Sequence, residues 1–83
     1  MNYYRAVYHG RVRRYGVLKE VNAFLRTNCD WTEDKLQTAM RDASSFETEV
    51  DDLEVTYLQK IGEHDRRSYN FDKELDLDQM LGI

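Results

Sequence analysis

The stretch YYRAVYHGRVRRYG at residues 3–16 constrains the fold of this chain more than any other segment. Two runs rich in tyrosine, valine and arginine flank the dipeptide His9-Gly10. Tyrosine and valine favour strands, and glycine readily adopts the positive φ that a two-residue type I′ turn requires. The pattern predicts a β-hairpin that turns at His9-Gly10 and sets Val7 opposite Val12. A longer loop is the alternative, because histidine is less usual than asparagine or aspartate at the other turn position.

The same register has consequences for charge. It sets Tyr4 opposite Tyr15 and places two like charges together, Arg5 opposite Arg14. Like charges directly across a strand pair are destabilising unless an acid lies nearby. We therefore expect Arg5 or Arg14 to pair with acids of a later strand.

Two helices are expected after the hairpin. In residues 17–28 the apolar side chains recur at helical spacing, and this stripe consists of Val17, Val21, Phe24 and Leu25. A second helix is predicted to begin at Thr32, whose side chain suits an N-cap. It carries the cation Arg41 near its end, where the helix dipole favours one. Its expected buried face consists of Leu36, Ala39, Met40 and Ala43, and Ser44-Ser45 ends it.

The segment DLEVTYLQKI at residues 52–61 has the period of a strand. Leu53, Val55, Tyr57 and Ile61 are expected to point to one side and Glu54, Thr56 and Lys60 to the other. Residues 62–70 read as a polar loop. Residues 71–83 predict either a short closing helix, with Asp72 as N-cap and Gly82 as its end, or an acidic tail.

These elements predict an α+β fold of the order ββααβ. A three-stranded antiparallel sheet is expected to be packed by two helices. Residues 1–62 would form the compact domain, and residues 63–83 a polar loop with an acidic C-terminal appendage.

Charge is distributed unevenly along the 83 residues. The chain carries a net charge of −4, but residues 1–43 contain eight lysines and arginines against five acids, whereas residues 44–83 contain four against eleven. The single cysteine, Cys29, cannot form an internal disulfide and fits a reducing compartment. Neither a signal peptide nor an apolar run of membrane-spanning length is recognisable, so a cytoplasmic protein is expected.

Residues with catalytic or metal-binding potential are few. Cys29, His9 and His64 do not have the spacing of a zinc site, and the acids around Asp51 lack the pattern of a calcium loop. A glycine-rich phosphate loop is also missing. The sequence predicts no enzyme activity, no metal site and no cofactor.

Two opposed surfaces are candidates for binding. Alternate carboxylates on a strand lie about 6.6 Å apart on one face and can imitate a row of phosphates. The predicted protein-binding residues are Glu49, Asp51, Asp52, Glu54, Asp72, Glu74, Asp76 and Asp78. The alternative is a nucleic-acid-binding surface on the hairpin and helices, formed by Arg5, Arg11, Arg13, Arg14, Arg26, Lys35 and Arg41.

The segment YYRAVYHGRVRRYGVLKEVNAFL resembles small proteins of phages and mobile elements of Gram-positive bacteria, which begin with a hairpin followed by a Gly-led helix. Ala6-Val7-Tyr8 with Gly10 match the hairpin, and the helix is matched by Gly16, Glu20, Val21, Phe24 and Leu25. That group includes inhibitors of the anti-CRISPR type. The resemblance implies a stoichiometric inhibitor, monomer or homodimer, in the cytoplasm of an infected bacterium. Its partner would be a host protein, such as a nucleic-acid-binding effector. Direct binding to nucleic acid, as in a helix-turn-helix-like regulator, is the alternative; membrane binding is not expected.

Overall fold

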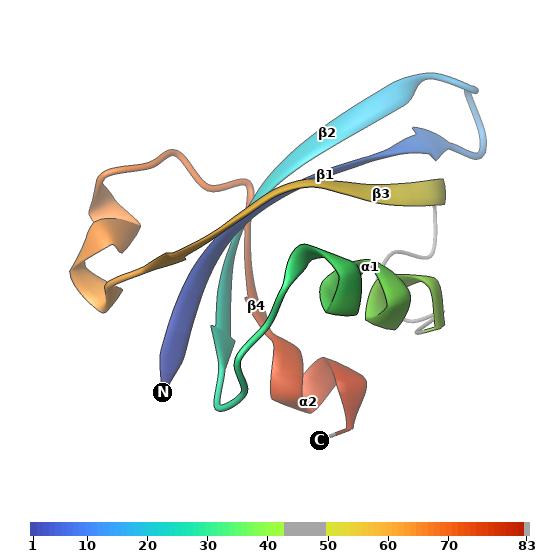
Figure 1. Cartoon of the computed structure of the whole chain (residues 1–83). Helices are drawn as coiled ribbons and strands as arrows, with labels where there is room; N and C mark the ends of the chain where they lie inside the picture. Colours follow the sequence, from blue (N-terminus) through green and yellow to red (C-terminus); the bar gives the residue numbers. More distant parts are fainter. Residues whose placement is uncertain (43–49, 83) are drawn as a thin grey trace.

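The structure of the protein is a computed structural model, and it describes residues 1–42 and 50–82. Four strands, two α-helices and one 3-10 helix follow one another along the described chain (Figure 1). They are β1 (Asn2–Val12), β2 (Leu18–Thr27), α1 (Glu33–Asp42), β3 (Val50–Ile61), η1 (Glu63–Arg67), β4 (Lys73–Asp76) and α2 (Leu77–Leu81).

The strands form one mixed sheet in the order β3-β1-β2-β4. β1 lies antiparallel to both β2 and β3, and β4 pairs with β2 in parallel. The expected ββααβ architecture, a three-stranded antiparallel sheet packed by two helices, is therefore wrong. The described chain has a fourth strand at one edge, and the segment expected to be the first helix is the second strand.

Residues 18–27 form a strand because their side chains suit two faces of a sheet. Val21, Ala23, Leu25 and Thr27 alternate and are all buried on the side that packs against the helices. The helical spacing of Val21, Phe24 and Leu25 is compatible with this alternation, since Phe24 is buried on the opposite face. Residues 18–27 pair with β1 along their whole length, and this pairing favours the strand over the helix. No helix-turn-helix unit remains in the described chain.

The β1–β2 hairpin turns at residues 13–16 instead of His9-Gly10. The Val12 backbone N–H donates to the Val17 carbonyl at 2.8 Å, and the Gly16 N–H donates to the Val12 carbonyl at 2.7 Å. Gly16 supplies the positive φ, 68°. Gly10 instead continues β1 and lies opposite Lys19.

This later turn changes every predicted cross-strand pair. Val7 lies opposite Asn22 and Tyr4 opposite Leu25. Arg5 lies opposite Phe24, so the expected clash with Arg14 does not arise.

β3 is a strand, as predicted, but a bulge changes which way its side chains point. Tyr57 pairs with Val7 and Val55 pairs with Tyr8, which leaves Thr56 as an extra residue between them. Residues directly opposite each other share a face, so Val55 points toward the helices while Tyr57 points away. The prediction that these two side chains share a face is wrong, although both join the same sheet.

α1 confirms the predicted second helix over the described residues. The Thr32 hydroxyl accepts a hydrogen bond from the Lys35 backbone N–H at 3.2 Å, as an N-cap does. Leu36 and Met40 are buried and Ala39 is half-buried. The predicted positions at Ala43, Ser44 and Ser45 lie outside the described residues.

The C-terminal segment completes the sheet before it becomes helical. β4 lies beside β2, and α2 begins after Asp76, whose carboxylate accepts from the Gln79 backbone N–H at 3.2 Å. Gly82 ends the helix with a φ of 71°, as expected. Asp72, the predicted N-cap, instead accepts a hydrogen bond from the Asn22 backbone N–H at 2.9 Å.

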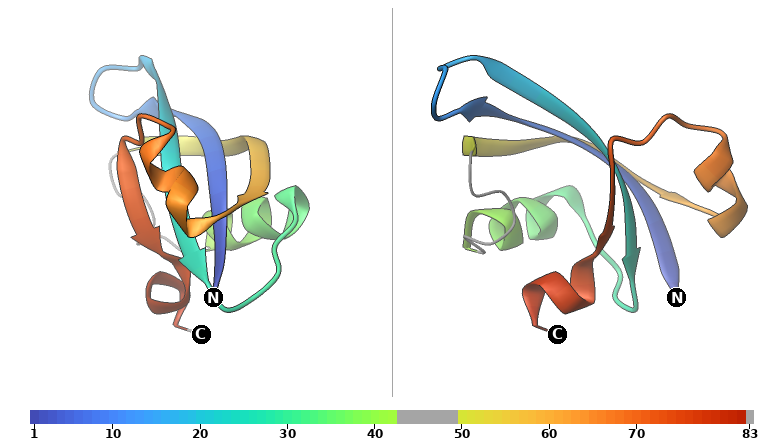
Figure 2. Two further views of the ribbon diagram at one scale, coloured as in Figure 1. Left: turned by 90° about the vertical axis from the view of Figure 1, so that its left-hand side faces the viewer. Right: turned by 180° about the vertical axis from the view of Figure 1, so that it is seen from behind.

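The core lies between α1, α2 and the inner face of the sheet, defined here as the face turned toward these helices. It is formed by Tyr4, Ala6, Tyr8, Val21, Ala23, Leu25, Leu36, Met40, Val55 and Leu77. Leu77 of α2 is fully buried, so residues 73–81 belong to the packed body. η1 and the chain that follows it lie on the other side of the sheet (Figures 1 and 2). None of the helices in the described ranges is long and apolar enough to span a membrane.

Candidate protein-binding surface

The outer face of the sheet, turned away from α1, carries the side chains of alternate residues on β1. These are Tyr3, Arg5, Val7, His9 and Arg11. The connection from η1 to β4 covers the lower half of this face. The upper half of the face continues into the projecting β1–β2 hairpin (Figures 1 and 2).

The hairpin tip, defined here as residues 11–19, is the most exposed apolar segment of the described chain. Tyr15, Val17 and Leu18 have exposed fractions of 69%, 56% and 68%. The tip also carries four cations: Arg11, Arg13, Arg14 and Lys19. Tyrosine and arginine beside exposed aliphatic side chains are the residue types that dominate binding at protein interfaces.

The arginines of the tip are engaged in different ways. Arg13 forms a two-pronged ion pair with Asp51 of β3, with Nε and Nη2 at 3.1 and 2.7 Å from Oδ1. This hydrogen bond lowers the pKa of the Asp51 carboxyl and raises the pKa of the Arg13 guanidinium. Arg11 donates to the Gly16 carbonyl at 3.1 Å, and the Arg14 guanidinium lies 5.5 Å from the ring centre of Tyr15.

Arg5 lies farther down the outer face in an aromatic setting. Its Cζ is 5.2 Å from the ring centre of Tyr57 and 4.7 Å from that of Tyr69. Its Nε donates to Asn22 Oδ1 at 3.1 Å. Neither Arg5 nor Arg14 pairs with a third-strand acid in the described residues, so that expectation is wrong; Arg13 makes this kind of pair instead.

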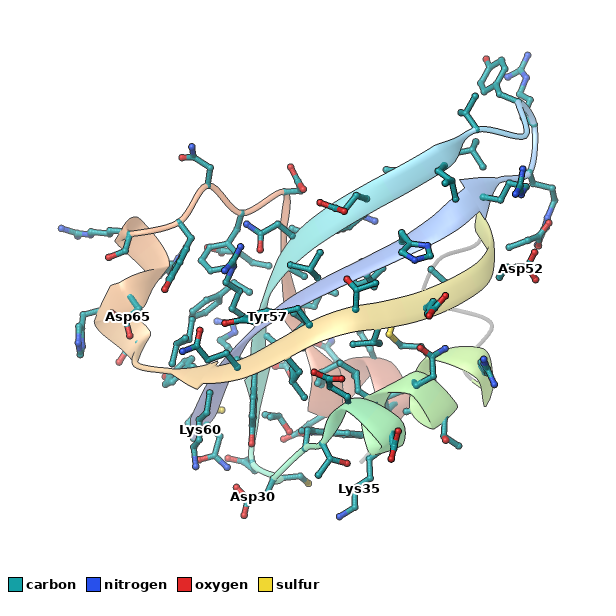
Figure 3. The ribbon with its side chains drawn as sticks, turned by 45° about the horizontal axis from the view of Figure 1, so that its top comes forward. Asp30, Lys35, Asp52, Tyr57, Lys60 and Asp65 are labelled. Atoms are coloured by element: carbon teal, nitrogen blue, oxygen red, sulfur yellow. The ribbon has the colours of Figure 1, made fainter. Side chains whose placement is uncertain are left out.

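Tyr57 is held in place on the outer face. Its hydroxyl donates to Gln59 Oε1 at 2.5 Å. Figure 3 shows Tyr57 and Lys60 on opposite sides of β3, as the regular alternation of a strand requires for residues three positions apart. Lys60 points toward the inner side, where its Nζ lies 3.6 Å from Asp30 Oδ1.

The lower part of the outer face is closed by an aromatic cluster. Phe24, only 2% exposed, has its ring centre 5.6 Å from Tyr3 and 5.3 Å from Phe71. Arg66 of η1 lies over Phe24 and forms a two-pronged ion pair with Glu74, one arm of which measures 2.8 Å. These contacts hold residues 68–72, which connect η1 to β4, against the outer face of the sheet.

His9 lies between two glutamates on the outer face. Glu20 is its partner on β2 and Glu54 its partner on β3. His9 Nε2 is 3.6 Å from Glu54 Oε2. In the described part of the chain, His9 Nδ1 is the one buried side-chain nitrogen or oxygen without a hydrogen-bond partner.

The predicted acidic residues of β3 lie near the hairpin tip. Asp51 is paired with Arg13, and Glu54 is next to His9. Asp52 has a φ of 56° at a second irregularity of the β1–β3 pairing and lies at the same end of the molecule as the tip (Figure 3). Glu49 lies outside the described residues.

The predicted acidic residues of the C-terminal segment lie at the opposite edge of the sheet, beyond β1 and β2. Asp72 and Asp76 accept backbone hydrogen bonds, and Glu74 pairs with Arg66. Asp78 Oδ1 accepts from the Thr27 hydroxyl at 2.6 Å, which lowers the pKa of this carboxyl. The seven predicted acids within the described residues therefore do not form one continuous surface.

The alternative basic surface is also divided. Arg11, Arg13 and Arg14 lie at the hairpin tip, whereas Lys35 and Arg41 are exposed on α1, across the sheet. Arg5 and Arg26 lie lower on the outer face of β1 and β2. The hairpin tip is the part of this set in which several cations come together.

The sequence did not single out Tyr15, Val17, Leu18 and Lys19 as binding residues. The available signal was Gly16, the other glycine able to form a hairpin turn, because a turn at Gly16 places these residues at an exposed tip. Tyr57 and Tyr69 beside Arg5 carry no local signal, because the three residues come from separate segments.

The described residues hold no group of three or more His, Cys, Asp or Glu side chains arranged to bind a metal ion. The chain matches no protein family, no curated protein and no solved structure.

Proposed function

We propose that this protein is a non-catalytic inhibitor that binds another protein stoichiometrically, with the hairpin tip as its principal docking element. The observation that carries the proposal is the exposure of Tyr15, Val17 and Leu18 on a projecting two-stranded arm. Exposed apolar side chains gathered on one protrusion are typical of an interaction site. A projecting arm can also enter a concave site on its partner.

A protein partner fits this surface better than a nucleic acid. The cations of the tip are accompanied by Asp51, Asp52 and Glu20, and the whole chain is acidic. Mixed charge around an apolar centre suits a protein interface, which has a polar rim around a hydrophobic core. The resemblance to phage inhibitors favours a host defence or nucleic-acid-handling protein as the target.

An acidic face that imitates nucleic acid remains the competing mode for the same partner. It receives less support, since the two acidic groups lie at opposite edges of the sheet and Asp51 and Glu74 are neutralised by arginines.

The test first uses the protein and two variants as bait to capture the target from host lysate. It then measures the binding of each to the purified target. The tip variant carries Tyr15→Ser and Leu18→Ser, and the acid variant carries Asp52→Asn and Glu54→Gln. We expect light scattering to show a one-to-one complex of the wild-type protein with its target. In titration calorimetry the tip variant should bind the target at least about tenfold more weakly than wild type, whereas the acid variant should bind like wild type. The reason is that interface anchors each contribute over about 1 kcal/mol. Weakening by the acid variant alone would instead identify the acidic face.

The second candidate function is nucleic-acid binding by the hairpin tip, favoured by its four cations. A two-stranded ribbon fits the major groove of duplex DNA. This function predicts a shift of labelled duplex or single strand that weakens with salt, because phosphate contacts release counterions. Arg14→Gln with Lys19→Gln would then flatten the salt dependence. Unchanged mobility of both probes at micromolar protein would exclude it.

A further inference from the structure

We propose that Arg5 and Gln59 form a receptor for a single carboxylate group presented by a partner protein. The inference rests on the proposed protein-binding function for its biological meaning, but the receptor itself is a property of this chain. It would accept an aspartate or glutamate side chain, or a chain terminus, that approaches the outer face of the sheet.

The orientation of the Arg5 guanidinium is fixed by its neighbours. One edge is held by the hydrogen bond from Nε to Asn22 Oδ1, and Asn22 is held in turn by its Nδ2, which donates to the Asn70 carbonyl at 3.2 Å. The rings of Tyr57 and Tyr69 lie within 5.2 and 4.7 Å of Cζ. A guanidinium fixed in this way loses little side-chain entropy when it binds.

The positive charge of Arg5 is not compensated by a carboxylate in the described residues. Within residues 1–42 and 50–82, ion pairs join Arg13 to Asp51 and Arg66 to Glu74, but no carboxylate lies at ion-pair distance from Arg5. Its terminal nitrogens have no hydrogen-bond partner in these residues. They are not buried either, since His9 Nδ1 is the one buried unpaired nitrogen described. They therefore reach solvent as unused donors.

A second hydrogen-bond donor lies beside Arg5 on the outer face. Gln59 is its direct partner on β3, and directly opposite residues share a face. The Tyr57 hydroxyl donates to Gln59 Oε1, which leaves Gln59 Nε2 as a donor without a partner in the described residues. Two arginine N–H donors and one amide donor match the two oxygens of a carboxylate.

The same surroundings argue for a carboxylate over a phosphate. The cross-strand neighbours of Arg5 are Phe24 and Gln59, both uncharged. One cation balances the single charge of a carboxylate, whereas a phosphate dianion would need a second. Arg66, whose guanidinium lies over the Phe24 ring, is already neutralised by Glu74.

The experiment uses the full chain and small probes, followed by NMR of the arginine Nε–Hε and glutamine amide signals. The probes are N-acetylglycinate, its uncharged amide and inorganic phosphate. We expect saturable shifts at Arg5 and Gln59 with the carboxylate, at least about fivefold tighter than at the exposed Arg14, because a second donor and a fixed fork add about 1 kcal/mol. A response at Arg5 no stronger than at Arg14, or tighter binding of phosphate, would overturn the inference.

Two variants keep the test independent of folding. Gln59→Glu supplies a carboxylate beside Arg5, so it should occupy the receptor and weaken probe binding at least about fivefold without lowering the melting temperature. Arg5→Lys retains the charge but loses the fork, and should weaken probe binding as well. Unchanged probe binding in Gln59→Glu would contradict the proposal. Because no partner is needed, probe binding without capture of a target would refute the proposed function alone.

Discussion

The Thr27 hydroxyl donates a hydrogen bond to Asp78 Oδ1 at 2.6 Å and joins the end of β2 to the first turn of α2, across 51 positions of sequence. The Thr27 hydroxyl oxygen also accepts hydrogen bonds from the Cys29 backbone N–H at 3.1 Å and from Trp31 Nε1 at 3.0 Å. Thr27 is fully buried. One hydroxyl thus links the sheet, the turn before α1 and the C-terminal helix.

Replacing Thr27 by valine should destabilise the protein by about 2–3 kcal/mol, since the similar shape is kept while buried polar partners lose their hydrogen bonds. Urea denaturation measures the loss. The matched control is Thr38→Val on the exposed side of α1, which should change the stability by less than about 0.5 kcal/mol. Equal losses in the two variants would contradict a special role of Thr27.

The Thr27–Asp78 bond should also make stability depend on acid pH. It lowers the pKa of Asp78, together with the bond from the Asn28 backbone N–H. A carboxyl with a depressed folded-state pKa stabilises the fold above its unfolded value, about 3.9, and loses this contribution as the pH falls through the folded value. The stability difference between wild type and Asp78→Asn should therefore shrink from neutral pH to about pH 3. A constant difference over this range would contradict the prediction.

Gln37 of α1 should protect the open edge of β3. Its Nε2 donates to the Leu53 carbonyl at 2.5 Å, and its Oε1 accepts from the Val55 N–H at 2.5 Å, as a neighbouring strand would. Gln37→Ala should cost about 1–3 kcal/mol and promote self-association through the freed edge. Denaturation and light scattering measure the two effects, with the exposed Gln79→Ala as control. A monomer of wild-type stability would refute this role.

Gly16 should tolerate asparagine better than alanine. Its φ is 68°, and a Cβ at this position would meet no atom within 4 Å, so strain rather than a clash decides the outcome. Gly16→Ala should destabilise the hairpin by about 1 kcal/mol, and Gly16→Asn by less, because asparagine adopts left-handed conformations more readily. Thermal denaturation of the two variants gives the order. A more stable alanine variant would show that the turn is not formed as described.

Phe24 should hold the connection between η1 and β4 on the sheet. It is buried under Tyr3 and Phe71 on the outer face. Phe24→Ala should cost about 3–5 kcal/mol, and amide exchange should accelerate in residues 66–72. Leu18→Ala, an equally apolar change at the exposed tip, should cost less than about 0.5 kcal/mol. Slow exchange in the connection of the Phe24 variant would contradict the assignment.

α1 and its N-cap could be predicted because their signals are local. The Thr32 cap acts on a residue three positions away, and Leu36 and Met40 face the core through helical spacing alone. Gly82 likewise ends α2 through its own backbone freedom. The strand character of β3 was also recognisable from its own composition.

The candidate surfaces depend on the position of the hairpin turn, which the local sequence did not determine. Gly10 and Gly16 are both able to form a hairpin turn, and the choice of Gly16 moves Arg13, Arg14 and Tyr15 from a paired strand to an exposed tip. That choice is made by the pairing of β1 with β2 and β3 over its whole length. The stretch of residues 3–16 thus consists of one long strand, up to Val12, and the turn after it.

By itself the sequence determined what depends on near neighbours: helix capping, the core stripe of α1 and the strand propensity of β1 and β3. Only the tertiary structure decided that residues 18–27 form a strand, that the bulge at Thr56 turns Tyr57 outward, and that Arg5 meets Tyr57 and Tyr69. The physical reason is range. Capping and turn strain act within a few residues, whereas strand pairing and the faces it creates depend on contacts between segments up to about sixty positions apart, whose free energy outweighs weak local preferences.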